Sequence, residues 1–393
     1  MSDRHPHAVL RAIRTVLPDT VIEQHRVRDI FARQEGLSRL GQRLVATAFD
    51  ASGIDTRHTV ITDFGESGAA PDDTVVRGDA PIYIDPTSGS LQAPGTKARN
   101  DHYIAEAGPI FVEAARRTIH AAHGIDAADV THVITVSCTG FFAPGPEYLI
   151  ARDLALDPAV QRYHLGFMGC YAALPALRMA AQFCAADPDA VVMVVSVELC
   201  TLHLHASDDP DLIVANSLFG DAGVAGIVSR RPLGPGERGL QLDRSETAVT
   251  PIGEGDMAWT IGDEGFDMVL STAVPQIIGE HIDAALRPLV AYEAELASAM
   301  NARRVGASVA RWAVHPGGRS IVDKVEEALG LTAHQVAPSR DVLRTIGNVS
   351  SATVMVVMQR NLEHYAEPGD RLIALAFGPG LTVESTLTTV VAG

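Results

Sequence analysis

The 393-residue sequence has no run of 18 apolar residues, so we expect no helix that crosses a membrane. Its first stretch, MSDRHPHAVLRAIRTVLPD, carries charges and prolines where a secretory segment needs an unbroken apolar run. Basic residues are also few: 31 Lys and Arg stand against 48 Asp and Glu, which gives a net charge of −17. Without a basic stripe, broad contacts to a nucleic-acid backbone are disfavoured. The sequence therefore predicts a cytoplasmic protein with no nucleic-acid partner and no membrane span.

Cysteine is rare as well, and the four thiols lie in apolar surroundings without the C-x2-C spacing of zinc sites. This pattern argues against a disulfide framework and a structural metal, and it favours reduced thiols. The stretch VELCTLHLH (197–205) still offers two histidines and a cysteine as ligands. On a strand, alternation would put His203 and His205 on one face and Cys200 on the other, so we predict no metal site. The four thiols are Cys138, Cys170, Cys184 and Cys200.

The residues that are plentiful indicate a large folded α/β protein, since 47% are hydrophobic and 20% are charged. Runs rich in Val and Ile alternate with helix-like segments, which predicts strands buried on both faces and joined by helices. The interval 229–256 is dense in glycine, proline and charge, so we place a boundary near residue 240. The two predicted units are 1–240 and 241–393. The predicted strands lie within 130–138, 190–200, 223–228, 310–316 and 371–377.

The two units repeat one order of features. In each, a strand end is followed by a glycine-led pair, Gly169-Cys170 or Gly347-Asn348, that opens a predicted helix, and then by another strand. Cys138 to Cys170 spans 170 − 138 = 32 positions, and His315 to Asn348 spans 348 − 315 = 33. A duplicated unit packs its halves about a pseudo-twofold axis, which brings equivalent strand ends and helix starts together. Cys170, His315 and Asn348 are therefore predicted to face one cavity.

These three side chains suit acyl transfer through a covalent intermediate. A thiol reacts as thiolate, and its pKa of about 8.5 falls at a helix N-terminus or beside an imidazolium. Cys170 can meet the first condition, His315 can supply the second, and Asn348 can donate to an oxyanion. Each also has a structural interpretation: core packing for Cys170, a turn cap for His315 and an N-cap for Asn348. Pro175 fits only the first turn of a helix, so the helix after Cys170 begins late or is irregular.

Seven motifs in a fixed order cover most of the chain. With them, the sequence resembles the type III polyketide synthases, the chalcone synthase-like branch of the thiolase-fold condensing enzymes. The resemblance implies a thiolase-like α/β fold of duplicated αβαβα layers and a homodimer. The motifs are SCTGFFAPGPEY (137–148), GFMGCYAALPALR (166–178), SLFGDAG (217–223), GFDMVLS (265–271), VHPGGR (314–319), GNVSSAT (347–353) and FGPGLTVE (377–384).

The resemblance also implies roles for single residues. Cys170 would be the nucleophile that holds the starter and the growing chain, and His315 and Asn348 would complete a triad that also promotes decarboxylation of malonyl-CoA. Phe219 and Phe266 fall at the family's two gatekeeper positions between the CoA tunnel and the reaction cavity.

Further cavity positions follow from the same resemblance. Cys138 matches a position where certain bacterial members carry a second cysteine, and His203 falls near a wall position that influences chain length. Gly378 and Pro379 belong to the cavity-shaping FGPG loop. The segment 44–58 lacks the basic spacing that plant relatives use for the CoA phosphates, so no phosphate ligand is assigned. The cations left open for that role are Arg39, Arg43, Arg57 and Lys97.

The leading hypothesis is iterative decarboxylative condensation of malonyl-CoA onto an acyl-CoA starter held as a thioester on Cys170, followed by cyclisation to a pyrone or resorcinol-type product. The CoA thioesters are substrates, and no cofactor is expected. The phrases FFAPGPEY and LGFMGCYAA resemble bacterial members that use fatty acyl starters, whereas a bulky His203 favours small ones. The alternatives are a β-ketoacyl-ACP synthase III-like enzyme, a Cys-His-Asn thioester hydrolase and a non-catalytic relative.

Overall fold

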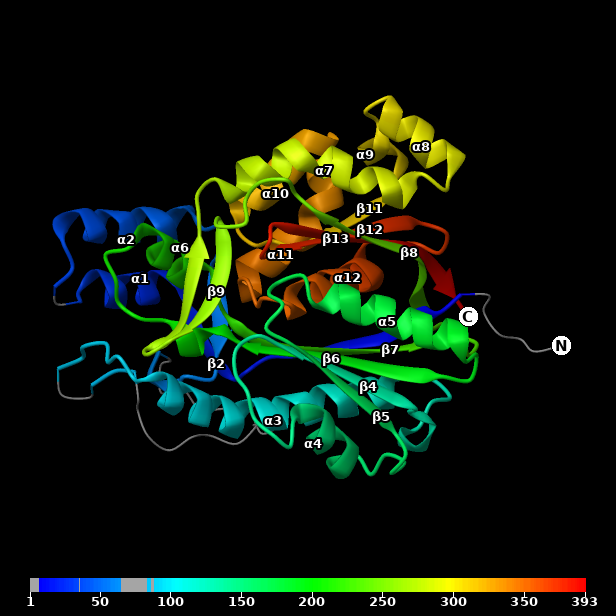
Figure 1. Ribbon diagram of the computed structural model, residues 1–393, viewed down its shortest axis with the longest axis horizontal. Helices are drawn as coiled ribbons and strands as arrows, with labels where there is room; N and C mark the ends of the chain where they lie inside the picture. Colours follow the sequence, from blue (N-terminus) through cyan, green and yellow to red (C-terminus); the bar gives the residue numbers. More distant parts are fainter. Residues whose placement is uncertain (1–6, 35, 65–82, 86–87) are drawn as a thin grey trace.

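Helix and sheet alternate in five layers in the computed structural model, which describes residues 7–34, 36–64, 83–85 and 88–393 (Figure 1). The central layer holds α5 (Ala173–Ala186) and α12 (Ala352–His364). Both helices are largely buried because strands of the sheet cover them on either side. The layers confirm the predicted duplicated αβαβα architecture. The outer layers hold α3 (Thr96–Ala121) and α4 (Pro146–Asp153) on one face, and α7 (Val274–Val290), α8 (Ala294–Asn301) and α10 (Arg319–Leu329) on the other.

The nine-stranded sheet has the same pattern in its two halves. Outward from the central pair β8–β1, each half has two antiparallel pairs and then a parallel pair, and β5 extends the first half by one parallel strand. Within the sheet the halves are joined by three residue pairs between β1 and β8. The order is β11 (Arg311–Val314), β12 (Arg371–Gly378), β13 (Thr382–Ala392), β8 (Arg238–Val249), β1 (Val9–Val16), β7 (Asp221–Ser229), β6 (Val191–Leu199), β4 (His132–Ser137), β5 (Gln161–Gly166).

The five predicted strands are confirmed as β4, β6, β7, β11 and β12. Their Val- and Ile-rich runs are buried because helices cover both faces of the sheet. The argument against a metal site treated 197–205 as a strand, whereas β6 ends at Leu199 and a 3₁₀ turn, η3 (Cys200–His203), follows. The argument from alternating faces for His203 and His205 therefore does not apply. Residue 240 lies inside β8, and the division into 1–240 and 241–393 stays a prediction.

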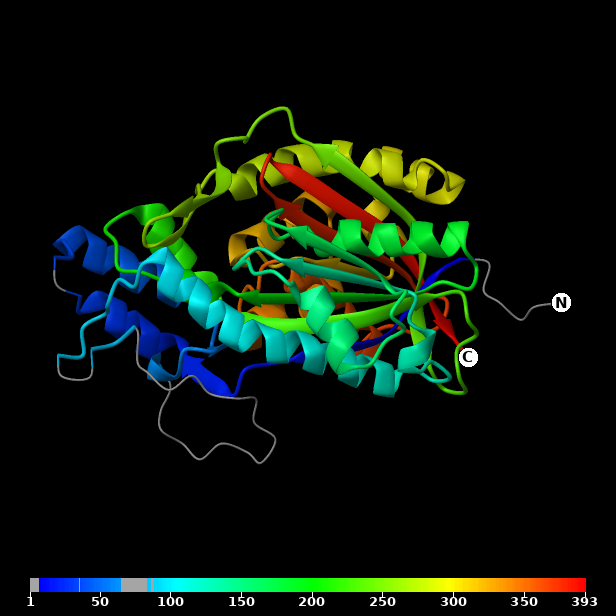
Figure 2. The same ribbon diagram turned by 60° about the horizontal axis from the view of Figure 1, so that its bottom comes forward.

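The remaining elements gather mainly at one end of the molecule, away from the C-terminus (Figure 2). A two-stranded hairpin, β9–β10, pairs with no other strand of the described residues. No helix of the described ranges is long and apolar enough to span a membrane. The elements at this end are α1 (Gln24–Ala32), α2 (Arg39–Ala51), α6 (Pro210–Leu218), β2 (Thr20–Glu23), β3 (Thr56–Thr59), β9 (Met257–Gly262) and β10 (Gly265–Leu270). Four further elements belong to the two halves. They are α9 (Val305–Ser308) and α11 (Ala333–Ile346) in the second half, and η1 (Thr62–Phe64) and η2 (Ala127–Asp129) in the first.

Candidate active site

One cavity opens where the strand ends of the two halves meet. It encloses about 620 Å³ of empty space, counting its mouth. Six of the nine predicted site residues line it, while Phe266, His203 and Gly378 do not. The six are Cys138, Cys170, Phe219, His315, Asn348 and Pro379.

Cys170 lies in a turn, three residues before α5 begins at Ala173. The prediction that it opens the helix is therefore wrong by about one turn, because Pro175 occupies the third helical position, where its missing N–H costs no helical hydrogen bond. Burial raises the pKa of the Cys170 thiol to about 11, although hydrogen bonds from the side chains of Ser350 and Asn348 act to lower it. The resting nucleophile candidate is thus a neutral thiol.

His315 follows directly after β11, and its backbone N–H donates to the Leu375 carbonyl at 2.7 Å, which continues the pairing with β12. The side chain is 1% exposed, and neither Nδ1 nor Nε2 has a hydrogen-bond partner among the described residues. Burial lowers the pKa of His315 to about 3, so the ring is neutral. A buried imidazole with both nitrogens unpaired indicates that a ligand, water or substrate completes the site.

Asn348 is held in place by its own backbone. Its N–H donates to the Leu218 carbonyl at 2.9 Å, and its carbonyl accepts from the Gly220 N–H at 2.9 Å. The side-chain Nδ2 donates to the Gly317 carbonyl at 3.2 Å, while Oδ1 accepts from the Ser350 N–H at 2.9 Å. Helix α12 begins only at Ala352, so Asn348 is not its N-cap. The other N–H of the amide serves the Cys170 sulfur, whose pKa the Asn348 side chain acts to lower.

The other predicted residues divide into those at the wall and those behind it. Cys138 accepts a hydrogen bond at Sγ from the Gly169 N–H at 3.1 Å, which ties it to the turn that carries Cys170. Phe266 and His203 stack behind the wall with ring centroids 4.1 Å apart. Gly378 packs against the Tyr171 ring, where an added Cβ would lie 2.3 Å from a ring carbon.

Sequence reasoning missed Glu198, a fully buried carboxylate at the end of β6. It accepts hydrogen bonds from the Cys138 N–H at 2.8 Å, from the Thr139 hydroxyl at 3.0 Å and from the Ser351 hydroxyl at the start of α12. Burial raises its pKa to about 7 despite these hydrogen bonds. The signal was visible as a lone acidic residue within the otherwise apolar run VVMVVSVELC, because an unpaired buried carboxylate is rare.

The hairpin β9–β10 was missed as a wall of the cavity. Five of the lining residues come from it. The spacing of Met257 and Trp259 along β9 puts both on one face, as alternation requires. The five residues are Met257, Ala258, Trp259, Met268 and Leu270.

The four candidate cations for a CoA phosphate have different surroundings. Arg57 is fully buried and donates to the carbonyls of Asn216 and Phe219 at 2.9 and 2.6 Å, so it supports the wall and is unavailable to a phosphate. Lys97 pairs with Asp101 on the surface of α3.

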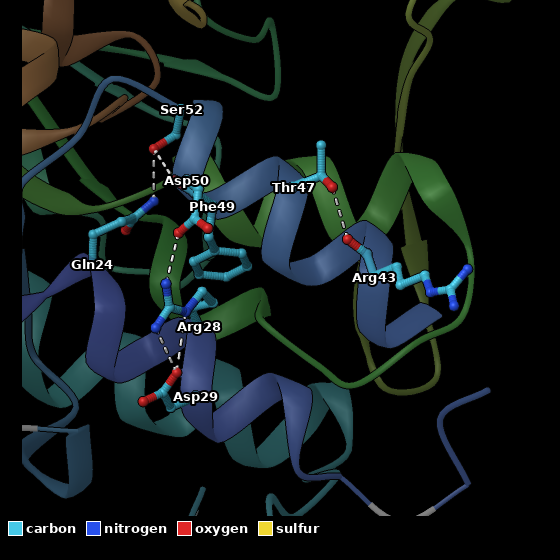
Figure 3. A network of polar contacts seen from close by, with 8 residues as sticks. All are labelled: Gln24, Arg28, Asp29, Arg43, Thr47, Phe49, Asp50 and Ser52. Carbon is cyan, nitrogen blue, oxygen red and sulfur yellow. Dashed lines mark hydrogen bonds and ion pairs between the residues drawn. The ribbon is translucent and has the colours of Figure 1, made fainter. Parts of the chain in front are cut away.

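Arg39 and Arg43 lie on the exposed side of α2. Figure 3 shows the Arg43 guanidinium directed away from the neighbouring network, in which Arg28 pairs with Asp29 and Asp50 at 3.0 and 2.7 Å. These two arginines remain the cations open to a ligand.

Comparison with known families identifies the family of the chain. Residues 82–232 match the N-terminal domain, and residues 241–392 the C-terminal domain, of the chalcone and stilbene synthases. Probable polyketide synthase 1 of Dictyostelium discoideum is 33% identical over 261 residues, which is 66% of this chain. The chain spans only 8% of the length of that relative. The chain belongs to the chalcone and stilbene synthase family of type III polyketide synthases.

Solved structures agree with this assignment over nearly the whole chain. The C-terminal type III polyketide synthase domain of Steely1, a type I/III hybrid from Dictyostelium, is 28% identical, with 98% of this chain and 100% of that chain covered and a TM-score of 0.85. PKS-I from the brown alga Ectocarpus siliculosus is 26% identical, with 99% and 100% covered and a TM-score of 0.84. The bacterial 1,3,6,8-tetrahydroxynaphthalene synthase of Streptomyces coelicolor A3(2) is 25% identical, with 98% and 100% covered and a TM-score of 0.81.

Proposed function

We propose that this protein extends an acyl-CoA starter with units from malonyl-CoA on Cys170 and then cyclises the chain to a pyrone or resorcinol-type product. The observation that carries the proposal is the cavity shared by Cys170, from the first half, and by His315 and Asn348, from the second. The His315 imidazole is buried, and neither nitrogen has a partner in the part of the chain that the structure describes, which leaves both available to exchange protons with a substrate.

The first step in this proposal loads the starter. A bond forms between the Cys170 sulfur and the acyl carbonyl carbon, and the carbon–sulfur bond to CoA breaks. The thiol proton passes to a ring nitrogen of His315 and from there to the departing CoA sulfur. Because Cys170 rests as a neutral thiol and His315 as a neutral ring, the proton moves during attack, and no preformed ion pair is required.

The second step makes the new carbon–carbon bond. Malonyl-CoA loses CO₂, and the electron pair of the broken bond becomes an enolate. A neutral imidazole N–H of His315 and the amide N–H of Asn348 that does not bond Gly317 stabilise the enolate oxygen, as donors in a buried site do most effectively. The enolate carbon then attacks the Cys170 thioester, and the cysteine leaves as thiolate. For another round, the Cys170 thiolate attacks the thioester carbonyl of the extended acyl-CoA, a new carbon–sulfur bond forms to Cys170, and the bond to CoA breaks so that CoA leaves as thiolate.

The partners proposed are the acyl-CoA starter, malonyl-CoA and a second copy of the chain. A homodimer is supported by three large apolar side chains that stay exposed on α3, on α4 and on the loop before α4. They are Ile104, Phe141 and Tyr148, which are 41%, 39% and 39% exposed. Light scattering on the purified protein tests this proposal, and a monomer at micromolar concentration would contradict it.

A product assay tests the central proposal. Purified protein is incubated with malonyl-CoA and a panel of acyl-CoA starters, and products are identified by mass spectrometry. We expect free CoA and cyclised polyketides from the CoA donors alone. Strict dependence on malonyl-ACP would favour a β-ketoacyl-ACP synthase, and release of free acid without condensation would favour a thioester hydrolase.

A further inference from the structure

Ser350 lines the cavity with Cys170, and its backbone has a conformation that serine rarely adopts. Its φ is +47°, in the left-handed region where a side chain causes steric strain. The Ser350 N–H donates to the Asn348 side-chain oxygen at 2.9 Å, and the Ser350 carbonyl accepts from the Thr353 hydroxyl at 2.8 Å. Strained residues that are held by their surroundings gather at functional sites, so a role for this side chain is worth seeking.

The Ser350 hydroxyl is hydrogen-bonded to the Cys170 thiol. The Asn348 side chain and the backbone N–H of Cys170 itself bond the same sulfur, and all three bonds favour the thiolate over the thiol. A hydroxyl has a single proton, so its bond to the sulfur uses its whole capacity as a donor. Ser350 is therefore in contact with the atom that gains negative charge whenever an acyl group leaves Cys170.

The ionisable side chains that share the cavity with Cys170 carry no positive charge in the resting protein. Burial lowers the pKa of His315 to about 3 and raises the pKa of Cys138 and of Cys200 well above the ordinary value, so all three are neutral. The negative charge of Glu198 acts to raise the pKa of Cys170 and so disfavours a thiolate there. A thiolate at Cys170 depends on hydrogen-bond donors for its stability.

The donors available to that thiolate during condensation can be counted. Asn348 has two amide N–H groups, and one of them is bound to the Gly317 carbonyl at 3.2 Å. In the proposed condensation the second N–H binds the enolate oxygen, together with His315. While that bond lasts, the Asn348 amide cannot also serve the Cys170 sulfur at full strength. The Ser350 hydroxyl is then the side-chain donor that remains for the sulfur.

We propose that the Ser350 hydroxyl is a catalytic donor that stabilises the Cys170 sulfur as the thioester breaks, while Asn348 and His315 stabilise the enolate. This inference rests on the proposed function and adds a catalytic residue to it. When the enolate carbon attacks the thioester, the carbon–sulfur bond breaks and its electron pair stays on the sulfur. The negative charge of the enolate thus moves to Cys170, and Ser350 binds it there without giving up its own proton.

Alkylation of Cys170 tests the bond from hydroxyl to sulfur and does not depend on polyketide synthesis. Purified protein is treated with iodoacetamide between about pH 7 and 9, and peptide masses give the rate at Cys170. Loss of a hydrogen bond to a charged group raises the pKa of the thiol by about 1, which leaves about tenfold less thiolate. The more basic thiolate is also more nucleophilic, which restores about threefold. We therefore expect Ser350→Ala to be alkylated at least about threefold more slowly than the wild type.

Ser350→Gly separates the hydroxyl from the strained backbone. Glycine adopts φ +47° without steric strain, whereas alanine keeps the strain of serine, and both lack the hydroxyl. We expect both variants to be alkylated equally slowly at Cys170. A slow rate in the glycine variant alone would show that the turn, and not the hydroxyl, controls the thiol, and would refute the proposal.

The matched control for the loss of a buried hydroxyl is Ser385→Ala. Ser385 is 1% exposed, donates to the Glu246 carbonyl at 3.3 Å and does not line the cavity. Its alanine variant should be alkylated at Cys170 at the wild-type rate. Equal rates in Ser350→Ala and Ser385→Ala would contradict a bond from Ser350 to the sulfur.

Two partial reactions test the division of donors. Product masses measure condensation with an acyl-CoA starter, and CO₂ release from labelled malonyl-CoA alone measures decarboxylation. We expect Ser350→Ala to lower condensation at least about tenfold more than decarboxylation, because His315 and Asn348 still face the enolate. Equal losses of the two reactions would refute the division. If the wild type condenses no malonyl-CoA, the proposed function fails, while alkylation still decides whether Ser350 donates to Cys170.

Discussion

The two halves of the molecule share a scaffold and differ in their chemistry. In each, a turn rather than a helix start presents the key residue: Cys170 lies three positions before α5, and Asn348 four positions before α12. At the strand ends, however, the first half places Cys138 and the buried carboxylate Glu198, whereas the second places the imidazole of His315.

The repeated scaffold thus brings equivalent strand ends and turns of the two halves to one cavity, while the residues at those positions differ and can serve different chemical steps. The first half holds the thiol on which an acyl group can be carried. The second holds neutral donors suited to an enolate. The two are joined across the centre by Glu198 of β6, which accepts from Ser351 at the start of α12.

The largest effect should come from removing the thiol of the first half. Cys170→Ala is expected to abolish the covalent acyl adduct and to lower polyketide formation by at least ~10³-fold, because no other side chain at that turn can form the thioester. Intact-mass analysis after incubation with acyl-CoA checks the adduct. An acyl adduct at the wild-type level in Cys170→Ala would overturn the nucleophile assignment, and Cys184→Ala, remote from the cavity, is the control.

Removing the imidazole of the second half should separate the two tasks. His315→Ala is expected to slow decarboxylation of malonyl-CoA by about 10²–10³-fold, since a preorganised donor to the enolate is lost. Cys170→Ala should retain more of that decarboxylation, because the thiol does not contact the enolate in the proposed mechanism. Release of CO₂ from labelled malonyl-CoA measures both variants. The reverse order of activities would show that the tasks are not divided in this way.

The carboxylate that joins the halves should make stability depend on pH. The pKa of Glu198 is raised to about 7 in the folded protein, above the ~4.3 of an unfolded glutamate, so the folded state binds this proton more tightly. Its contribution to stability is full below about pH 4.3 and is lost as the pH rises through 7. Relative to Glu198→Gln, the wild-type free energy of unfolding should fall by about 3 kcal/mol between pH 4.5 and 8.

Urea denaturation at a series of pH values measures this difference. Asp221, whose pKa burial raises to about 6, titrates in both proteins and cancels in the comparison. Glu295→Gln, on the exposed surface of α8, serves as the control. A difference that stays constant over this pH range would mean that Glu198 does not titrate as the structure requires.

The smallest effects should distinguish the glycines that precede the two key residues. Gly347 has φ +82°, and a Cβ there would lie 2.9 Å from the Leu218 carbonyl oxygen, which already accepts from Asn348. Gly169 has φ +88°, and its Cβ would meet the Pro379 ring at 2.5 Å. Both alanine variants should be destabilised by more than the ~1 kcal/mol of left-handed backbone strain alone. Gly347→Ala should lose about 1 kcal/mol more of the free energy of unfolding than Gly169→Ala. The reason is that the Leu218 carbonyl, held by its hydrogen bond from Asn348, can move away from the added methyl group less easily than the Pro379 ring can.

Thermal unfolding of the two alanine variants measures this order. Gly236→Ala is the matched control, because Gly236 has φ +76° but nothing within 4 Å of an added Cβ. Gly236→Ala should therefore lose only the free energy of unfolding that corresponds to the left-handed backbone strain. Equal losses at all three glycines would show that local packing at the two turns contributes nothing.

Much of the fold could be predicted because it depends on patterns of residues that are close together in the sequence. The Val-rich runs gave the strands, and the matched spacings of Cys138 to Cys170 and His315 to Asn348 indicated the duplication. The position of Pro175, which fits only the first turn of a helix, correctly predicted that the helix begins after Cys170. The alternating faces considered for 197–205 do not form: apolar alternation in the sequence continues past Leu199, but the chain turns there and places His203 behind Phe266.

The sequence by itself determined the class of fold, the triad candidates and their convergence, because periodicity and spacing depend on neighbours along the chain. Only the tertiary structure decided which residues form the cavity wall and which support it. Arg57, a candidate phosphate ligand by charge, proved to be a buried support of the Phe219 backbone, and His203, a candidate wall residue, lies behind the wall. The protonation of Cys170, His315 and Glu198 was likewise set by burial, which depends on segments far apart in the sequence.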